Sequence, residues 1–582
     1  MTLLTRLHSL SLRVGSRLPP SLSPYTQRNL SSSVCRYSVN LSYASSPSDH
    51  TLSGATIGEL FNKQVEATPD RDMIVFSRDN VRLTYQQFKS KMDDLAAGLL
   101  ALGLKPGDRV GIWSPNRAEW VLTQIATAHI GLIMVNVNPA YRVQELEYAI
   151  QKVGMKAMIM AESFKTQDYY EMMFELFPEL SRCPPGRLQC HRAPELTSVV
   201  IMGDTVKPGT HTFNQVCQMG TQEHRLEMEK IAKNIHFDEP VNIQFTSGTT
   251  GNPKGATLTH HNLVNNSRFI GYRMGYHETI NRICLPVPLY HCFGMVGGSM
   301  MNVVHGVTCV YPAPSFEPEA SLQSIQSEKC NILYGTPTMF IDTLNHPNFD
   351  NYDVTSLESG IMAGSPCPIE VMKEVNDKLH MPKACVAYGS TETSPVTFLT
   401  FPDDSLEKRC GSIGCLLDHT EAKIVDETGQ VVPEVKDKAK TDSAISPTQW
   451  YHTGDIGIMD EDGYVMINGR IKDMIIRGGE NVFPVEIEQF LYTHPAIEDV
   501  QIVGVPDKRM GEEICACIRV KEGMSVSEQE LKDFCKGEIS HFKIPKYVVC
   551  VESFPLTVTG KVQKFVMRAD LVEKLGLQHE AP

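Results

Sequence analysis

The chain has 582 residues, of which 42% are hydrophobic and 21% are charged, with 54 Lys and Arg against 68 Asp and Glu. This composition is typical of a folded protein of several domains, and it excludes collagen-like, coiled-coil and wholly disordered chains. The formal net charge of −14 disfavours a dedicated nucleic-acid-binding protein. No uninterrupted run of about 18 apolar residues occurs, so we expect no transmembrane segment.

The first 48 residues differ from the rest of the chain. They contain five arginines and many serines, and the first acidic residue is Asp49. Such a basic, hydroxylated and acid-poor leader resembles a mitochondrial transit peptide, and residues 3–10 are expected to form a basic amphipathic helix. We therefore expect residues 1–48 to direct the protein to the mitochondrial matrix. An untargeted N-terminal tail is the alternative.

Short apolar segments alternate with segments of helical periodicity from about residue 56. Thr84 predicts the start of a helix over 85–102, which Gly103 ends. The other expected elements of this region are strands at 72–77, 109–113, 132–137, 156–161, 199–202 and 283–287, and helices at 118–129 and 143–153. Repeated β-α-β units predict an α/β domain of parallel sheets covered by helices, over residues 49–471.

The pattern changes after Arg470. We expect helices at 484–492 and 526–536, and strands at 499–505, 514–520 and 547–552. These elements predict a compact α+β domain over residues 472–582. The 16 cysteines are scattered and include no C-x-x-C pair, so we expect reduced thiols and no zinc site.

The most informative segment follows an apolar strand at 241–245 and reads Thr-Ser-Gly-Thr-Thr-Gly-Asn-Pro-Lys-Gly over residues 246–255. Its glycines let the backbone approach a ligand closely, and its N–H groups and hydroxyls are suited to donate to phosphate oxygens. It differs from the G-x-x-x-x-G-K-[ST] loop because no Ser or Thr follows the lysine. We predict a phosphate-binding loop made of Thr246, Ser247, Gly248, Thr249, Thr250, Gly251, Asn252, Pro253 and Lys254.

This loop and four later motifs resemble those of the adenylate-forming superfamily of acyl-CoA synthetases, luciferases and adenylation domains. The later motifs are YGSTET at 388–393, YHTGD at 451–455, GRIKD at 469–473 and PLTVTGK at 555–561. Their order extends the resemblance over about residues 56–575. It implies a large N-terminal domain of helix-covered parallel sheets with a small β subdomain, followed by a small mobile α+β domain.

The resemblance implies two half-reactions. A carboxylate attacks the α-phosphorus of ATP to form an acyl-adenylate and pyrophosphate, and a CoA thiol then displaces AMP. The first step brings two anions together, so catalysis requires charge neutralisation and positioning. In this scheme Tyr388 stacks on adenine, Thr391 contacts the α-phosphate, and Glu392 holds Mg²⁺.

Three further residues receive roles from the same resemblance. Asp455 accepts hydrogen bonds from both ribose hydroxyls, and Arg470 adds a fixed positive charge near the ribose and phosphates. Lys561 reaches between the carboxylate and the α-phosphate. Lys472 is either the hinge between the two domains or a simple linker residue, and His291 either gates the acyl pocket or is a packed core histidine.

Within the family the chain resembles mitochondrial medium-chain acyl-CoA ligases, which implies fatty acid, ATP and CoA as small-molecule substrates. The oligomeric state stays open. The chain departs from the family pattern before the YxTGD motif: the resemblance implies a stretch of about twenty residues there, whereas residues 433–441 run almost directly to Trp450. We expect that loss to leave unpaired strand edges. Two alternatives to a medium-chain fatty acid ligase stay open. One is the same chemistry on another carboxylic acid, and the other, suggested by the missing segment, is an inactive variant that binds nucleotide.

Overall fold

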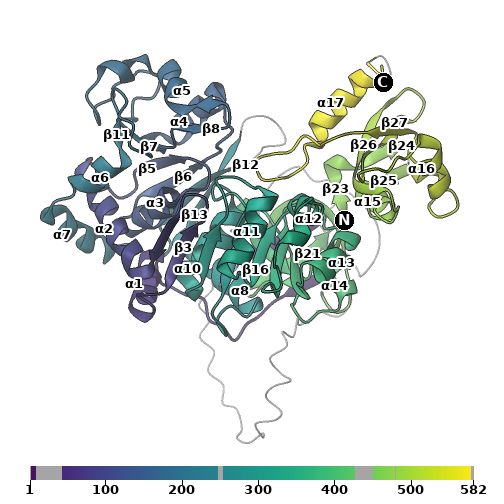
Figure 1. The fold of residues 1–582 in the computed structure, drawn as a ribbon, viewed down its shortest axis with the longest axis horizontal. Helices are drawn as coiled ribbons and strands as arrows, with labels where there is room; N and C mark the ends of the chain where they lie inside the picture. Colours follow the sequence, from purple (N-terminus) through teal and green to yellow (C-terminus); the bar gives the residue numbers. More distant parts are fainter. Residues whose placement is uncertain are drawn as a thin grey trace, which may run out of the picture.

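The computed structural model describes residues 2–7, 42–246, 253–425, 431, 450–478 and 480–578. These residues form a large domain and a small domain at one end of it (Figure 1). In the described part of the chain, the large domain contains two extended mixed sheets, a five-stranded antiparallel sheet and a two-stranded antiparallel pair, β8 (Ser163–Phe164) with β9 (Gln167–Asp168). This arrangement confirms the predicted α/β fold with a small β subdomain and a C-terminal α+β domain.

The first extended sheet is built from the predicted β-α-β units. Its order in the described residues is β11 (His211–Thr212), β10 (Ser198–Ile201), β7 (Met155–Met160), β5 (Arg109–Trp113), β6 (Ile133–Val137), β12 (Pro240–Thr246) and β13 (Lys254–Thr259). Neighbouring strands are parallel except β12 and β13. The helices of this part are α2 (Tyr85–Ala101), α3 (Ala118–His129), α4 (Val143–Val153), α5 (Tyr169–Leu176), α6 (Phe213–Met219) and α7 (Gln222–Ala232).

The second extended sheet has a parallel centre and antiparallel edges. Its order in the described residues is β20 (Cys415–Leu416), β19 (Val396–Leu399), β18 (Lys383–Gly389), β17 (Ser359–Ala363), β16 (Ile332–Gly335), β14 (Arg282–Cys284), β15 (Thr308–Tyr311), β3 (Asp72–Phe76) and β4 (Val81–Thr84). The strands from β18 to β3 are parallel. The associated helices are α1 (Ile57–Ala67), α8 (His260–Arg273), α10 (Met300–His305), α11 (Pro318–Glu328), α12 (Pro337–Leu344), α13 (Ile369–Lys378) and α14 (Leu406–Gly411).

Local sequence signals explain where several helices begin and end. The Thr84 hydroxyl accepts from the Gln87 backbone N–H, and the Gln87 side chain accepts from the Thr84 N–H, which is a capping box. Gly103 has a φ of +83°, in the region that favours glycine after a helix. Helix α2 therefore lies where the sequence predicted it.

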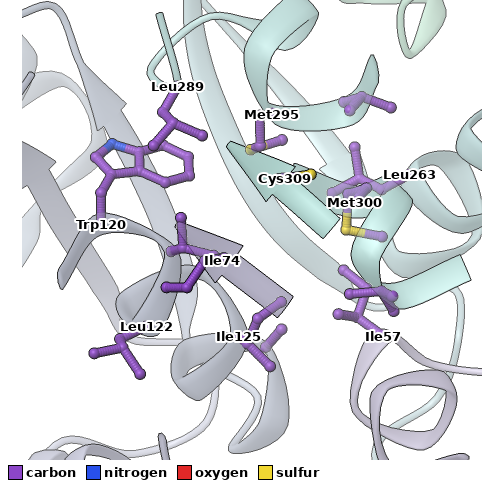
Figure 2. Close-up of a cluster of buried hydrophobic side chains, with 14 of the residues drawn as sticks. Ile57, Ile74, Trp120, Leu122, Ile125, Leu263, Leu289, Met295, Met300 and Cys309 are labelled. Carbon is purple, nitrogen blue, oxygen red and sulfur yellow. The ribbon is translucent and has the colours of Figure 1, made fainter. Parts of the chain in front are cut away.

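The largest hydrophobic core lies between the helices and strands of the two extended sheets. Trp120 and Ile125 of α3 are fully buried in it, together with Ile74 of β3 and Met300 of α10 (Figure 2). Burial of such side chains stabilises the fold by about 1.5–3 kcal/mol each. The core fixes the two sheets against each other, so that strand ends from both contribute to one site.

The antiparallel sheet includes a strand from the N-terminus. Its order in the described residues is β2 (Tyr43–Ser45), β21 (Thr420–Val425), β1 (Thr2–Leu7), β22 (Tyr451–Met459) and β23 (Val465–Arg470). Strand β1 pairs antiparallel with both β21 and β22. The helix predicted at residues 3–10 is therefore wrong for residues 3–7, because their backbone groups pair with strands that are distant in sequence.

Residues 42–48 also belong to the folded part, although the predicted leader extends to residue 48. Strand β2 pairs with β21, and Ala44 is fully buried. Residues 8–41, which hold most of the predicted transit peptide, lie outside the described residues, as does the shortened segment at 433–441. Strand β1 pairs with β21 and β22, the described strands on either side of that segment in the sequence, and the expectation of unpaired strand edges stays a prediction.

The small domain has the predicted α+β composition. Its sheet in the described residues contains β25 (Glu480–Val482), β24 (Ile475–Arg477), β27 (Gly511–Val520), β26 (Ile497–Asp507) and β28 (Tyr547–Cys550). Its helices are α15 (Pro484–Leu491), α16 (Glu528–Cys535) and α17 (Lys564–Lys574). The yellow chain that precedes α17 extends to the large domain (Figure 1), where Val558 packs against the hydrophobic cluster of the first extended sheet.

Among the described residues, no helix is both long and apolar enough to cross a bilayer. Every described cysteine is a free thiol, and most of them are buried.

Candidate active site

The predicted site residues come together where three structural units meet. Asp455 and Arg470 lie on the antiparallel sheet, Thr391 and Glu392 follow strand β18, and Lys561 belongs to the small domain. The charges of Asp455, Glu392 and Arg470 all act on the pKa of Lys561, so these groups share one electrostatic environment.

Asp455 is held in place by its own strand pair. It lies opposite Arg470 in the β22–β23 register and is only 5% exposed. One carboxylate oxygen accepts a hydrogen bond from the Tyr388 hydroxyl, and the other lies 3.4 Å from Arg470 Nε. Burial raises the pKa of Asp455, and Arg470 and the Tyr388 hydroxyl oppose that rise.

Tyr388 makes a contact that the sequence did not predict. Its ring packs edge-to-face on Phe398, with centroids 6.0 Å apart, and its hydroxyl donates to Asp455. The residue thereby orients the carboxylate proposed for ribose binding. The predicted stacking of its ring on adenine stays a prediction.

The turn after β18 is fixed by close backbone packing. A β-carbon on Gly389 would lie 1.8 Å from the Pro395 carbonyl oxygen, so only glycine fits there. The Thr393 hydroxyl donates to that same oxygen at 2.6 Å. The short helix η4 (Thr391–Thr393) follows, with the Thr391 hydroxyl 3.6 Å from the Cys292 sulfur.

Glu392 is exposed at this turn and is the predicted ligand for Mg²⁺. In the described residues, no group of three or more His, Cys, Asp or Glu side chains is arranged to hold a metal. A single accessible carboxylate nevertheless suits Mg²⁺ that arrives with nucleotide, because this ion commonly binds one or two carboxylates together with phosphate oxygens.

Lys561 ends a tight turn that brings it into the large domain. The turn is closed by hydrogen bonds from the Thr557 N–H to the Lys561 carbonyl at 2.8 Å and from the Lys561 N–H to the Thr557 hydroxyl at 3.0 Å. Gly560 has a φ of +78°, which favours glycine. Burial and the nearby Arg470 charge lower the pKa of Lys561, whereas Asp455 is among the groups that raise it.

His291 lies beside the same lysine. Its Nδ1 accepts a hydrogen bond from the Phe293 N–H at 3.2 Å, so the ring caps the short helix α9 (Cys292–Gly294). Burial, reinforced by the Lys561 charge, lowers the pKa of His291 to about 3. The imidazole is therefore neutral at physiological pH. Its proximity to Lys561 places it at the site, and the gating role stays a prediction.

The phosphate-binding loop is described only at its two ends. Ser247, Gly248, Thr249, Thr250, Gly251 and Asn252 lie outside the described residues. At the base of the loop Thr246 pairs with Lys254, and the Thr246 hydroxyl donates to the Lys254 carbonyl at 3.4 Å. The Tyr148 hydroxyl donates to the Pro253 carbonyl at 3.2 Å, and Lys254 is exposed. Strand β13 lies beside η4, so the base of the loop adjoins Thr391 and Glu392.

Sequence reasoning missed Cys292 as a member of the site, and it considered Lys472 only as a hinge or linker residue. Cys292 contacts the Thr391 hydroxyl, and Lys561 affects the pKa of its thiol. The sequence did offer one signal for Cys292, because this residue directly follows the predicted site residue His291. Lys472 lies close enough to Asp455 for their charges to interact, and burial lowers the pKa of its ammonium group. Arg470 and Lys472 both act on the Asp455 carboxylate, and Arg470 also acts on Lys561, so three cations share the site with the Asp455 and Glu392 carboxylates.

Family profiles match both domains. The profile described as AMP-binding enzyme matches residues 61–438, and the profile described as AMP-binding enzyme C-terminal domain matches residues 486–561. The first match alone covers more than half of the chain.

Two curated relatives illustrate the similarity in sequence. The protein named medium-chain acyl-CoA ligase ACSF2, mitochondrial, from Danio rerio is 47% identical over 558 residues, which cover 93% of this chain and 92% of the relative. The Homo sapiens protein of the same name is 44% identical over 559 residues, covering 92% and 91%.

Solved structures show the same fold. An anthranilate CoA ligase, AuaEII, in complex with anthranoyl-AMP has a TM-score of 0.77 at 22% identity, over 91% of this chain and 99% of that one. ATP-bound MatB from Rhodopseudomonas palustris has a TM-score of 0.73 at 24% identity, over 89% and 99%.

Proposed function

Because this chain belongs to the AMP-binding enzyme family, we propose that it joins a medium-chain fatty acid to coenzyme A in two steps. The fatty acid carboxylate first attacks the α-phosphorus of ATP, and the bond from that phosphorus to pyrophosphate breaks. The CoA thiol then attacks the carbonyl of the acyl-adenylate, and AMP leaves with the C–O bonding electrons. The products are acyl-CoA, AMP and pyrophosphate.

One observation carries the proposal. A lysine of the small domain, Lys561, is partly buried beside the groups of the large domain that the family motifs assign to nucleotide binding. Its positive charge offsets the repulsion between the carboxylate and the α-phosphate as they approach. Burial leaves the docked ammonium poorly solvated, which lowers its pKa, so the group gains strongly from an anionic partner.

The remaining residues bind and orient the nucleotide in this proposal. Asp455 accepts from the ribose hydroxyls through the acceptor positions that Tyr388 leaves free, and Arg470 stabilises phosphate charge. Thr391 donates to the α-phosphate, and the loop from Thr246 to Lys254 holds the outer phosphates. Glu392 holds Mg²⁺, which when bound supplies further neutralisation of phosphate charge.

The acid is assigned from the names of the relatives, which specify medium-chain substrates at 44–47% identity. The same names carry the word mitochondrial, and the arginine-rich N-terminus supports import into the matrix. The neutral His291 suits a place beside an apolar chain, because a charged imidazole would be costly to bury there.

CoA-dependent AMP release, measured against straight-chain acids of increasing length, tests this function. We expect a maximum at medium chain lengths and almost no release from Lys561→Ala, which should still bind ATP. Preference for an aromatic or branched acid would favour the same chemistry on another substrate. ATP binding without pyrophosphate release from the wild type would contradict the proposed ligase and favour an inactive nucleotide-binding protein.

A further inference from the structure

Thr336 departs from the behaviour of an ordinary helix-capping threonine. It occupies the N-cap position of α12, yet its hydroxyl makes no capping hydrogen bond. The Thr336 Oγ1 is buried and has no hydrogen-bond partner among the residues that the structure describes. The residue as a whole is 2% exposed. Threonine hydroxyls at this position normally accept from a backbone N–H of the first turn, so this arrangement forgoes a stabilising contact.

The hydroxyl lies under the turn that carries Lys561. A β-carbon built on Gly560 would lie 2.8 Å from Thr336 Oγ1, which shows how closely the turn covers the hydroxyl. On the other side, a β-carbon on Gly364 would lie 3.4 Å from Thr336 Cγ2 and 3.5 Å from Lys561 Cε. Thr336 is therefore part of the surface on which the turn at residues 557–561, here called the lysine turn, docks.

Docking of this turn has an unfavourable component. If the lysine turn were away from the large domain, water would reach the Thr336 hydroxyl and hydrogen-bond to it. When the turn docks, that partner is lost and none replaces it among the described groups. A buried hydroxyl without a partner disfavours the docked arrangement on the order of tenfold.

We propose that Thr336 is a positioning residue that limits how tightly the lysine turn docks on the large domain, so that Lys561 withdraws once the acyl-adenylate has formed. This inference rests on the proposed two-step function, in which the CoA step follows the loss of pyrophosphate. Burial of the apolar part of the turn, including Val558, favours docking. The Thr336 hydroxyl opposes it, which keeps the two arrangements close in free energy.

Substitutions at this contact shift the balance in opposite directions. Thr336→Val keeps the shape of the side chain and removes the unpaired hydroxyl, so the docked arrangement should gain about tenfold. Thr336→Ser keeps the hydroxyl and should behave as the wild type. Gly560→Ala places a methyl against Thr336 Oγ1 in a backbone conformation that favours glycine, and it should oppose docking.

The test measures the two half-reactions separately. ATP–pyrophosphate exchange reports adenylate formation, and conversion of supplied octanoyl-adenylate by CoA reports thioester formation. For Thr336→Val we expect exchange at or above the wild-type rate and thioester formation about tenfold slower. For Gly560→Ala we expect exchange to fall while thioester formation is kept. Thr343→Val on the same helix removes a hydroxyl that has a partner, at 2.7 Å from the Met339 carbonyl, and should leave the ratio of the two rates unchanged.

Hydrogen–deuterium exchange of residues 555–563 gives a readout that does not depend on catalysis. Thr336→Val should protect these amides more than the wild type and Thr336→Ser. Equal protection and an equal ratio of half-reactions in Thr336→Val and the wild type would overturn the inference, as would an equal shift in Thr336→Ser. If the wild type performs neither half-reaction, the proposed function fails, while the exchange measurement still decides the role of Thr336.

Discussion

Replacement of Asp455 by asparagine is the sharpest test of how the site holds the nucleotide. The carboxylate is 5% exposed, accepts from the Tyr388 hydroxyl and lies 3.4 Å from Arg470 Nε. Asparagine keeps the shape of the side chain, and its amide oxygen is still able to accept from Tyr388. The substitution removes the negative charge and turns one acceptor atom into a donor. We therefore expect the fold to be kept and nucleotide binding to weaken.

The free acceptor positions of the carboxylate determine the size of the effect. An ionised carboxylate offers about four of them. Tyr388 occupies one and Arg470 lies near a second, which leaves two for the ribose hydroxyls. A hydrogen bond to a charged group contributes about 1.5–3 kcal/mol. Loss of one to two such bonds should weaken ATP binding by about 1.5–6 kcal/mol, or roughly 10- to 25,000-fold.

Titration calorimetry with ATP and with 3′-deoxy-ATP measures this effect and its cause. In the wild type the missing hydroxyl should weaken binding about tenfold or more, whereas in Asp455→Asn it should cost little further. Asp473→Asn serves as the control, because it removes a nearby carboxylate that repels Asp455. The ribose assignment is refuted if Asp455→Asn binds ATP as the wild type does, or if both proteins lose the same affinity for the deoxynucleotide.

Three further predictions concern stability. Burial raises the pKa of Asp499 to about 6, so the folded state holds this proton more tightly than the unfolded state. The unfolding free energy of the wild type relative to Asp499→Asn should thus be highest below pH 4 and fall as the pH rises to 6; parallel curves in urea titrations would contradict this. Gly389→Ala should fail to fold because its methyl would lie 1.8 Å from the Pro395 carbonyl oxygen. The control Gly411→Ala, which has nothing within 4 Å of the added methyl, should melt at the wild-type temperature. Equal melting temperatures for Gly389→Ala and the wild type would refute the clash. Deletion of residues 1–41 removes β1 and should speed amide exchange in β21 and β22 about tenfold or more, and unchanged exchange would show that β1 does not pair there.

The elements that the sequence predicted well carry local signals. Thr84 and Gln87 form the capping box that starts α2, and Gly103 follows its end with a positive φ, so both boundaries depend on nearby residues. The alternation of strands and helices that builds the first extended sheet likewise repeats over short stretches of sequence. The sequence predicted site roles for Asp455, Glu392 and Lys561 because each stands in a particular motif, and the structure brings their charges into one electrostatic environment, while the roles stay predictions.

The parts that the sequence did not predict depend on contacts between distant residues. The hydrogen bond from the Tyr388 hydroxyl to Asp455 joins residues 67 positions apart. The unpaired hydroxyl of Thr336 is anomalous only because the lysine turn covers it from another domain. Periodicity describes which face of an element is apolar, but it carries no information on which distant group lies against a given polar atom.

Strand β1 is the clearest case of a distant contact that outweighs local pattern. The basic and apolar character of residues 3–10 predicts an amphipathic helix, yet the backbone of Thr2–Leu7 pairs on one side with β21 and on the other with β22, the strand that carries Asp455. Backbone pairing on both sides is a non-local gain that an isolated helix of this length lacks, since short helices are marginal in water. Cleavage of the leader between residues 8 and 42 during import would remove β1. A chain cleaved in this way therefore has no β1 to pair with β21 and β22. In a chain that keeps its N-terminal segment, the sheet that carries Asp455 is continuous from β21 through β1 to β22. In a chain that has lost the segment, β21 and β22 each lose β1 as a pairing partner.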